Sequence, residues 1–162
     1  MTPRVGIGYD SHRFEAGRRL VLGGVEIDHP RGLAGHSDAD VLTHALIDAL
    51  LGAGGLGDLG THFPAGDERW RDADSLDLLR TVIGMLSGSP LSADATLIAE
   101  EPRLGPYRGE MEHNLSEVLG VPVSIKASSN EGLGWIGRAE GIACVAVALI
   151  ETGAGAASPP SE

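Results

Sequence analysis

The stretch His36-Ser-Asp-Ala-Asp40-Val-Leu-Thr-His44-Ala-Leu-Ile-Asp48 carries the strongest helical pattern in the chain. Its apolar residues recur at steps of three and four, the spacing of a helix face that packs on a core. These residues are Val41, Leu42, Ala45, Leu46, Ala49 and Leu50. We expect a helix that runs to about Ala53, with Ser37 or Asp38 as its N-cap and with Asp40 completing an approximate capping box with Ser37.

A strand is expected upstream, over residues 4–12. Its side chains alternate with period two: Val5, Ile7 and Tyr9 face one way, and Gly6, Gly8, Asp10 and His12 face the other. Asp10 and His12 therefore point to the same side. Gly6-x-Gly8 does not indicate a dinucleotide loop, because the third glycine is missing and no helical pattern follows.

Asp10, His12 and His44 together offer one carboxylate and two imidazoles. This donor set suits Zn²⁺ bound by three protein ligands, with a fourth position open to water or substrate. Asp40 and Asp48 lie one helical turn from His44, so either could fix the tautomer of that histidine. The alternative is a surface pair of Asp10 and His12 and a hydrogen-bonded core histidine. Spacing alone leaves both interpretations open.

Two further segments carry polar groups that could bind an anion or a cation. His36 and Ser37 precede the expected helix, whose N-terminal N–H groups favour phosphate, although Ser37 could serve only as a cap. Residues 126–131, Lys-Ala-Ser-Ser-Asn-Glu, end an expected strand. Their hydroxyls could hold phosphate oxygens and Glu131 a hard cation such as Mg²⁺, or the segment could be an ordinary turn.

The composition places limits on partners and compartment. The chain has 162 residues and a formal net charge of −11, which argues against a nucleic-acid or anionic-membrane surface as its main partner. No stretch reaches the roughly 20 apolar residues that span a bilayer. Cys144, the single cysteine, lies in an apolar run and is interpreted as a core residue in a reducing compartment. We expect a cytoplasmic protein.

The remaining patterns predict an α+β domain. A Gly23-Gly24 turn joins two short strands over 20–22 and 25–27. Further helices are expected over 73–86 and 106–119, and further strands over 93–100, 123–128 and 141–150; irregular loops are expected over 28–35, 57–67 and 131–138. This order favours a mixed sheet with helices on one face. The apolar strand 141–150 should be buried on both faces, which suggests that other subunits cover the second face. The domain is expected over 1–152 and a disordered tail over 153–162.

Five separated motifs, taken in order, resemble those of the 2-C-methyl-D-erythritol 2,4-cyclodiphosphate synthase family of the non-mevalonate isoprenoid pathway. They are Gly8-Tyr-Asp10-Ser-His12, Gly23-Gly24-Val25, His36-Ser-Asp-x-Asp40 with His44 and Asp48, Gly57-Asp58-Leu-Gly60, and Gly134-x-x-Gly137-Arg138-x-Glu140-Gly-Ile-Ala-Cys144. The resemblance covers residues 4–151. It implies a lyase that closes 4-diphosphocytidyl-2-C-methyl-D-erythritol 2-phosphate into a cyclic diphosphate and releases CMP.

The resemblance also implies a homotrimer with active sites between neighbouring subunits. Asp10, His12 and His44 would bind Zn²⁺, and Glu131 a second divalent cation, Mg²⁺ or Mn²⁺. His36 and Ser129 would support the transition state. The substrate would be held by Asp10, Ser11, His12, His36, Ser37, Asp58, Leu59, Gly60, Phe63, Asp67, Ala99, Arg103, Leu104, Gly105, Ser128, Ser129, Asn130, Glu131, Trp135 and Arg138. Trp135 and Arg138 would also line an axial cavity that accepts an isoprenoid diphosphate.

Several positions depart from the family pattern. Members usually have glycine where Ala39 stands, threonines where Ser128-Ser129-Asn130 stand, lysine where Arg103 stands and an acidic residue where Ala65 stands. Serine keeps the hydroxyl and arginine keeps the charge, so these changes preserve substrate binding. Ala65 removes a polar contact from the loop 61–67, which is expected to order over substrate.

Overall fold

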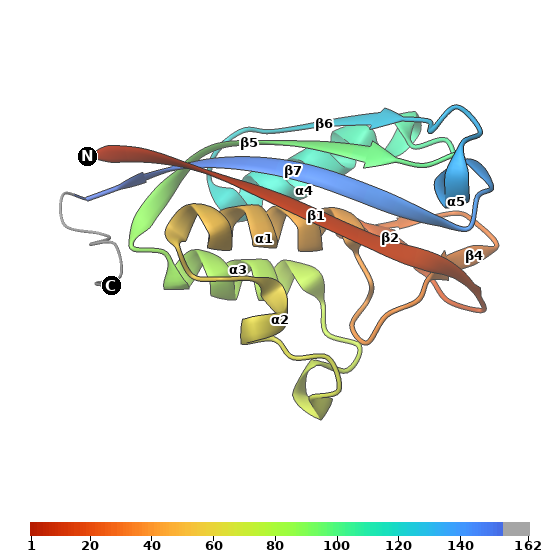
Figure 1. The fold of residues 1–162 in the computed structure, drawn as a ribbon, viewed down its shortest axis with the longest axis horizontal. Helices are drawn as coiled ribbons and strands as arrows, with labels where there is room; N and C mark the ends of the chain where they lie inside the picture. The colour runs from red at the N-terminus through yellow and green to blue at the C-terminus, as the bar shows by residue number, and fades with distance from the viewer. Residues whose placement is uncertain (154–162) are drawn as a thin grey trace.

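The structure, a computed structural model, describes residues 1–153 and contains one five-stranded mixed sheet with helices on one face (Figure 1). The α+β prediction is therefore confirmed. The strands are β1 (Thr2–Ala16), β2 (Leu20–Leu22), β3 (Val25–Ile27), β4 (Arg31–Leu33), β5 (Gly88–Ile98), β6 (Val123–Ser128) and β7 (Gly141–Thr152). The helices are α1 (Val41–Gly54), α2 (Leu59–His62), η1 (Glu68–Trp70), α3 (Ser75–Met85), η2 (Gly105–Tyr107), α4 (Arg108–Leu119) and α5 (Gly134–Gly137).

The sheet has the order β4-β1-β7-β5-β6, in which only the β5–β6 pair is parallel. The strands β2 and β3 form the predicted hairpin as a separate two-stranded sheet. The sequence patterns missed β4 inside the expected loop 28–35, and the short helices α2 and α5 inside the other two loops. The predicted division at residue 152 stays a prediction, since residues 154–162 lie outside the described part.

Two glycines bring α1 against β1. A Cβ atom on Gly8 would lie 1.9 Å from the carbonyl oxygen of Ala45, and one on Gly6 would lie 1.9 Å from that of Ala49. Any side chain at these positions would push the helix away, because backbone atoms cannot yield as a flexible side chain can. This close approach places His44, next to Ala45 on α1, beside the polar end of β1.

Helix α1 begins later than the sequence predicts, and its cap is Asp40 rather than Ser37 or Asp38. The carboxylate of Asp40 accepts hydrogen bonds from Thr43 N at 3.0 Å and from the hairpin amides of Gly23 and Gly24 at 2.9 Å each. Asp40 is fully buried. The hairpin selects this cap, because a buried carboxylate needs several donors. The capping role predicted for Ser37 is wrong.

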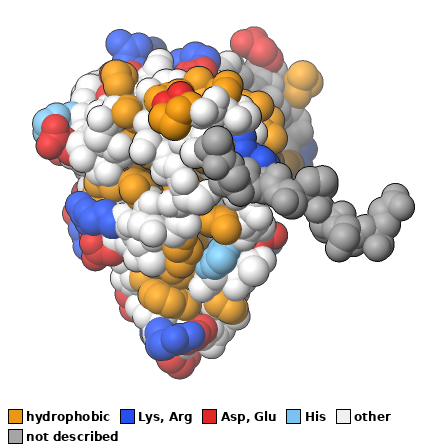
Figure 2. All heavy atoms as spheres, turned by 90° about the vertical axis from the view of Figure 1, so that its left-hand side faces the viewer, with side chains coloured by type: hydrophobic (Ala, Val, Ile, Leu, Met, Phe, Trp, Pro, Cys, Tyr) orange, Lys and Arg blue, Asp and Glu red, His pale blue; other side chains and the backbone are white. Residues whose placement is uncertain are grey.

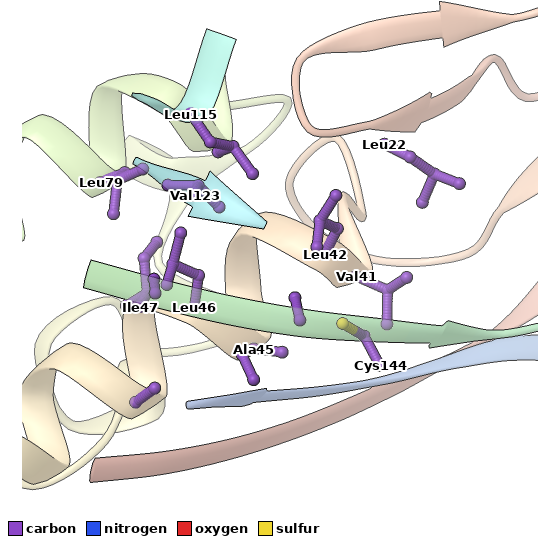
Figure 3. Packing of buried hydrophobic residues seen from close by; sticks show 14 of the residues in the cluster. Leu22, Val41, Leu42, Ala45, Leu46, Ile47, Leu79, Leu115, Val123 and Cys144 are labelled. Carbon is purple, nitrogen blue, oxygen red and sulfur yellow. The ribbon is translucent and has the colours of Figure 1, made fainter. Parts of the chain in front are cut away.

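The core lies between the sheet and α1, with α3 and α4 completing the helical layer. Figure 3 shows Leu46 and Ile47 of α1 on the side of Leu79, Leu115 and Val123, which come from α3, α4 and β6, and Leu42 of α1 toward Leu22 of β2; all belong to one buried hydrophobic cluster. Cys144 of β7 is fully buried in this core, as predicted. Burial raises the pKa of its thiol, so this cysteine is an inert packing residue.

The second face of the sheet carries exposed apolar side chains. Val5, Ile7 and Tyr9 of β1 are 68%, 70% and 57% exposed, and Val147 of β7 is 39% exposed. Strand β7 is therefore buried on both faces only if another chain covers this side. Figure 2 views the molecule from the end where β1 begins. Apolar side chains form patches on this surface between uncharged groups, and acidic and basic side chains lie next to one another around them. Within residues 1–153, no helix is both long and apolar enough to cross a membrane.

Candidate metal centre and substrate site

Asp10 and His12 of β1 meet His44 of α1 in a compact cluster. The Oδ2 atom of Asp10 lies 2.8 Å from His12 Nε2 and 3.2 Å from His44 Nδ1. The two ring nitrogens are 3.4 Å apart. The prediction that these three side chains lie together is confirmed.

The outward nitrogens of the two imidazoles are held by different groups. His12 Nδ1 lies 2.8 Å from the carbonyl oxygen of Ala34, which can only accept, so in the neutral ring Nδ1 carries the hydrogen and Nε2 has none. His44 Nε2 lies 2.8 Å from Ser75 Oγ and 3.2 Å from Ser37 Oγ. Both rings thus turn one nitrogen toward Asp10.

The predicted outer partners of His44 on its own helix are wrong. Asp40 serves the hairpin and the helix cap, and the carboxylate of Asp48 accepts a hydrogen bond from Leu59 N at 2.7 Å. The partner is instead Ser75, at the first position of α3, which is fully buried. The three polar side chains at i, i+4 steps therefore have different roles: Asp40 caps the helix, His44 belongs to the metal cluster, and Asp48 binds the start of α2.

The charges in the cluster reinforce one another. Burial opposes ionisation of Asp10, but hydrogen bonds from His12 and His44 outweigh it and lower the pKa of this carboxyl to about 2. Burial also opposes a charge on His44, but its hydrogen bond with Asp10 and the nearby carboxylates raise the pKa of the imidazole. Asp10 therefore stays ionised beside His12 Nε2 and His44 Nδ1, and an ionised carboxylate next to two imidazole nitrogens is well suited to bind a cation.

The donor geometry fits a zinc ion. Ligands at about 2.0–2.2 Å in a tetrahedral Zn²⁺ site lie roughly 3.3 Å from one another. The three separations in the cluster, 2.8, 3.2 and 3.4 Å, lie close to that spacing before any metal draws the ligands together. Three protein donors also leave one coordination position for a substrate oxygen.

A hollow beside the cluster collects residues from several elements. It is lined by Asp10, His12, His36, Ser37, His44, Asp48, Leu59, Phe63, Ala65, Trp70 and Leu78. Two further predicted substrate residues are the neighbours of Leu59 in the chain. Gly60 lies within α2, and Asp58 is its N-cap, whose carboxylate accepts a hydrogen bond from Thr61 N at 2.9 Å. The segment from α2 to η1 projects away from the sheet below α1 (Figure 1).

The interpretation of His36 and Ser37 as an anion site at a helix N-terminus is wrong in its physical basis, because α1 begins only at Val41 and its cap is buried. His36 nevertheless lines the hollow. Its Nε2 lies 2.9 Å from the carbonyl oxygen of Asp67, so the imidazole is joined to the projecting segment. Asp67 itself forms an ion pair with Arg69 at 2.6 Å.

A second group of predicted residues lies at the far edge of the sheet, where β5 and β6 end. Leu104 and Gly105 line a hollow there, together with Arg108 and Lys126. The adjoining segment 128–131 is held by an Asn130 N hydrogen bond to Glu100 Oε1 at 2.7 Å. Ala99 N donates to the carbonyl oxygen of Ser128 at 3.0 Å, which places Ala99 at this edge, and Arg103 directly precedes Leu104 in the chain.

Within segment 128–131, Ser129 Oγ lies 3.1 Å from Glu131 Oε1. Glu131 has a left-handed backbone, φ 54°, which costs a non-glycine residue about 1–3 kcal/mol and is common at functional sites. Ala39 has φ 56°, in the left-handed region that favours glycine, which is the residue that the family resemblance implies at this position. Trp135 borders a third hollow with Ser11 and Glu140, and Arg138 pairs with Glu140 at 2.9 Å.

Within one chain, the metal cluster and the residues at the β6 edge lie far apart. Asp10 is aligned with Cys144, Cys144 with Leu97, and Leu97 with Ala127. Three steps between strands separate the metal cluster from the β6 edge by about 14 Å.

Three contributors to the site were missed from the sequence. Ser75 and its partner Asp38 support His44, and Trp70 lines the metal-side hollow, where its ring packs edge-on against Phe63 with centroids 4.9 Å apart. The only available signal was Asp74-Ser75, a cap pattern within the first residues of the helix expected over 73–86. Nothing in the spacing links that cap to His44.

A single mixed sheet with helices on one face and an Asp-His-His cluster between β1 and α1 defines a class of small α+β enzymes with a metal-binding site. The YgbB family model matches residues 3–151. A 2-C-methyl-D-erythritol 2,4-cyclodiphosphate synthase from Symbiobacterium thermophilum is 59% identical over 152 residues, which are 90% of this chain and 97% of the relative. The chain belongs to the YgbB family, which contains these synthases.

Solved structures agree with this assignment. A 2C-methyl-D-erythritol-2,4-cyclodiphosphate synthase in its CDP-bound form is 38% identical, with a TM-score of 0.83 over 91% of this chain and 100% of the other. The IspF protein of Plasmodium falciparum in complex with CDP is 32% identical, with a TM-score of 0.80 over 93% of this chain and 96% of the other.

Proposed function

We propose that this chain is a cyclising phosphorus–oxygen lyase that converts 4-diphosphocytidyl-2-C-methyl-D-erythritol 2-phosphate into 2-C-methyl-D-erythritol 2,4-cyclodiphosphate. An oxygen of the 2-phosphate bonds to the β-phosphorus, the bond from that phosphorus to the bridging oxygen breaks, and CMP leaves with the bridging oxygen. The family assignment and the names of the relatives support this reaction. The observation that carries it is the Asp10, His12 and His44 cluster, in which each imidazole turns one ring nitrogen toward the carboxylate.

Asp10, His12 and His44 would hold Zn²⁺, and Glu131 would hold a second divalent cation, Mg²⁺ or Mn²⁺. Bound cations supply charge neutralisation and a template for bringing two phosphates together. The nucleophile is already an oxyanion, so the protein needs no strong base; its task is positioning and electrostatic stabilisation.

The other side chains would position the substrate. Leu59 and Phe63 line the metal-side hollow. Together with Asp58, Gly60 and Asp67 of the same segment, they would hold the methylerythritol part, with Ser11 and Ser37 near the phosphates. Ala99, Arg103, Leu104, Gly105 and Ser128–Glu131 would hold cytidine diphosphate at the β6 edge. His36 and Ser129 would donate hydrogen bonds to the charge that develops on the phosphoryl oxygens.

The active unit would be a homotrimer. The exposed stripe of Val5, Ile7 and Tyr9, with Val147 beside it, is an apolar sheet face that association would bury. The 14 Å between the two groups of site residues supports the same view, because neighbouring chains could bring one group of each together. Trp135 and Arg138 would line the axial cavity that accepts an isoprenoid diphosphate. We place this enzyme in the cytoplasm.

The reaction is tested by supplying the purified chain with the diphosphocytidyl substrate, Zn²⁺ and Mg²⁺, and identifying the products by ³¹P NMR and mass spectrometry. We expect CMP and the cyclic diphosphate in equal amounts, with turnover abolished by a strong chelator and restored by adding metal. Release of inorganic phosphate or an open-chain phosphate would instead indicate a zinc hydrolase. Binding without turnover would indicate an isoprenoid-diphosphate binding protein.

A further inference from the structure

His44 is the one ligand of the cluster whose outward nitrogen faces side chains alone. Its Nε2 lies 2.8 Å from Ser75 Oγ, and Ser75 is fully buried. Ser75 Oγ in turn donates to Oδ1 of Asp38, and Ser75 N donates to Oδ2 of the same carboxylate at 2.9 Å. A chain of three side chains thus runs outward from the metal cluster.

The direction of each hydrogen bond in this chain follows from Asp38. Its Oδ1 also accepts from Asp40 N at 3.1 Å, so both carboxylate oxygens already face donors. An ionised carboxylate can only accept, so the Ser75 hydroxyl hydrogen points to Asp38. The Ser75 oxygen then turns its lone pairs toward His44, and Nε2 of His44 must carry the hydrogen. In a neutral imidazole, this leaves Nδ1 bare.

We propose that Ser75 and Asp38 are positioning residues of the metal site, where Ser75, oriented by Asp38, accepts the Nε2 hydrogen of His44 and presents its Nδ1 to the cation. The inference rests on the proposed metal role of the cluster. Outer partners of this kind fix both the tautomer and the ring orientation of a ligating histidine, and they raise its basicity.

His12 provides an internal contrast. Its outer partner is the backbone carbonyl of Ala34, which no substitution of a side chain removes. The nearer outer partner of His44 is the Ser75 hydroxyl, which is backed by a negative charge, and the Ser37 hydroxyl lies farther away at 3.2 Å; His44 is therefore the more strongly polarised ligand. Removal of the Ser75 hydroxyl should therefore change His44 and leave His12 as it is.

The first experiment needs no variant. In metal-stripped protein labelled with ¹⁵N-histidine, at an alkaline pH where the imidazoles are neutral, long-range ¹H–¹⁵N spectra distinguish the two tautomers. We expect His44 with hydrogen on Nε2 and His12 with hydrogen on Nδ1. Hydrogen on Nδ1 of His44 would overturn the inference whether or not the protein binds metal.

The second experiment measures zinc affinity by competition with a chromophoric chelator. Ser75→Ala should weaken zinc binding about 10–100-fold, the usual effect of losing an outer partner. The His44 spectrum should become a mixture of tautomers while that of His12 stays unchanged. Asp38→Asn should act in the same direction but less strongly, because an amide oxygen can still accept from Ser75.

The matched control is Thr152→Val, which removes another buried hydroxyl, one that donates to the Thr2 carbonyl at 3.1 Å at the opposite end of β1. It should leave zinc affinity and both tautomers unchanged. Wild-type zinc binding that Ser75→Ala does not weaken would contradict this inference alone. A wild-type chain that takes up no zinc would contradict the proposed function instead, and the tautomer spectrum would still decide the role of Ser75.

Discussion

The metal cluster and the segment 128–131 at the end of β6 are both assigned to the substrate, but one is enclosed by the core and the other is exposed. His44 is 6% exposed and is held by α1, α3 and β1, whereas Ser129 and Glu131 are exposed and hydrogen-bond to each other. A metal site needs fixed donor positions, so the core provides them before any ligand binds. The exposed segment can gain its order from substrate and a neighbouring chain.

The largest effect should come from the enclosed part. His44→Ala removes a ligand, and since loss of an outer partner alone costs about 10–100-fold, zinc affinity and turnover should fall by on the order of 10³-fold or more. Elemental analysis and the product assay measure both. His113→Ala, on the exposed face of α4, is the control. Unchanged zinc content in His44→Ala would refute the ligand assignment.

In the proposed trimer, a neighbouring chain covers the open sheet face. Ile7→Asp places a charge on that face, and an unpaired buried charge costs about 3–5 kcal/mol, so the trimer should dissociate and turnover should fall with it. Sedimentation velocity measures the assembly. Met85→Asp alters an exposed apolar residue of α3, on the helical side, and should leave the assembly intact. A trimer that survives Ile7→Asp would exclude this face as the interface.

The exposed segment should contribute to rate without contributing to the zinc site. Ser129→Ala removes a hydroxyl donor, and the loss of one donor to developing charge costs about 10²-fold in kcat. Zinc content should stay at the wild-type value, in contrast to His44→Ala. A parallel loss of zinc would show that the two parts are not built independently.

The smallest effect should come from the close contact between α1 and β1 that positions the metal cluster. Gly8→Ala should destabilise the fold by about 3 kcal/mol, because its Cβ would meet the Ala45 carbonyl oxygen. Gly84→Ala, in α3 with open space around it, should stabilise by about 0.5–1 kcal/mol. Urea unfolding measures both. Equal effects would show that close approach of α1 to β1 does not constrain the fold.

Sequence patterns predicted what local periodicity controls. The alternation in β1 indicated that Asp10 and His12 share a side, and the helical repeat indicated the face of α1. The cap of α1 was not predictable, because Ser37, Asp38 and Asp40 are all good caps and the choice depends on amide donors from Gly23 and Gly24. Ser75 was missed for the same reason: it lies 31 residues from His44, and only the packing of α3 on α1 brings them together.

The central claim is that one active site combines the metal cluster of one chain with the segment 128–131 of the next. Co-expression of the His44→Ala and Ser129→Ala chains with different tags, followed by purification of mixed trimers, tests it directly. In a closed ring of two chains of one variant and one of the other, roughly a third of the sites receive both intact parts, so turnover should recover well above that of either variant. Mixed trimers no more active than the parent variants would contradict the claim.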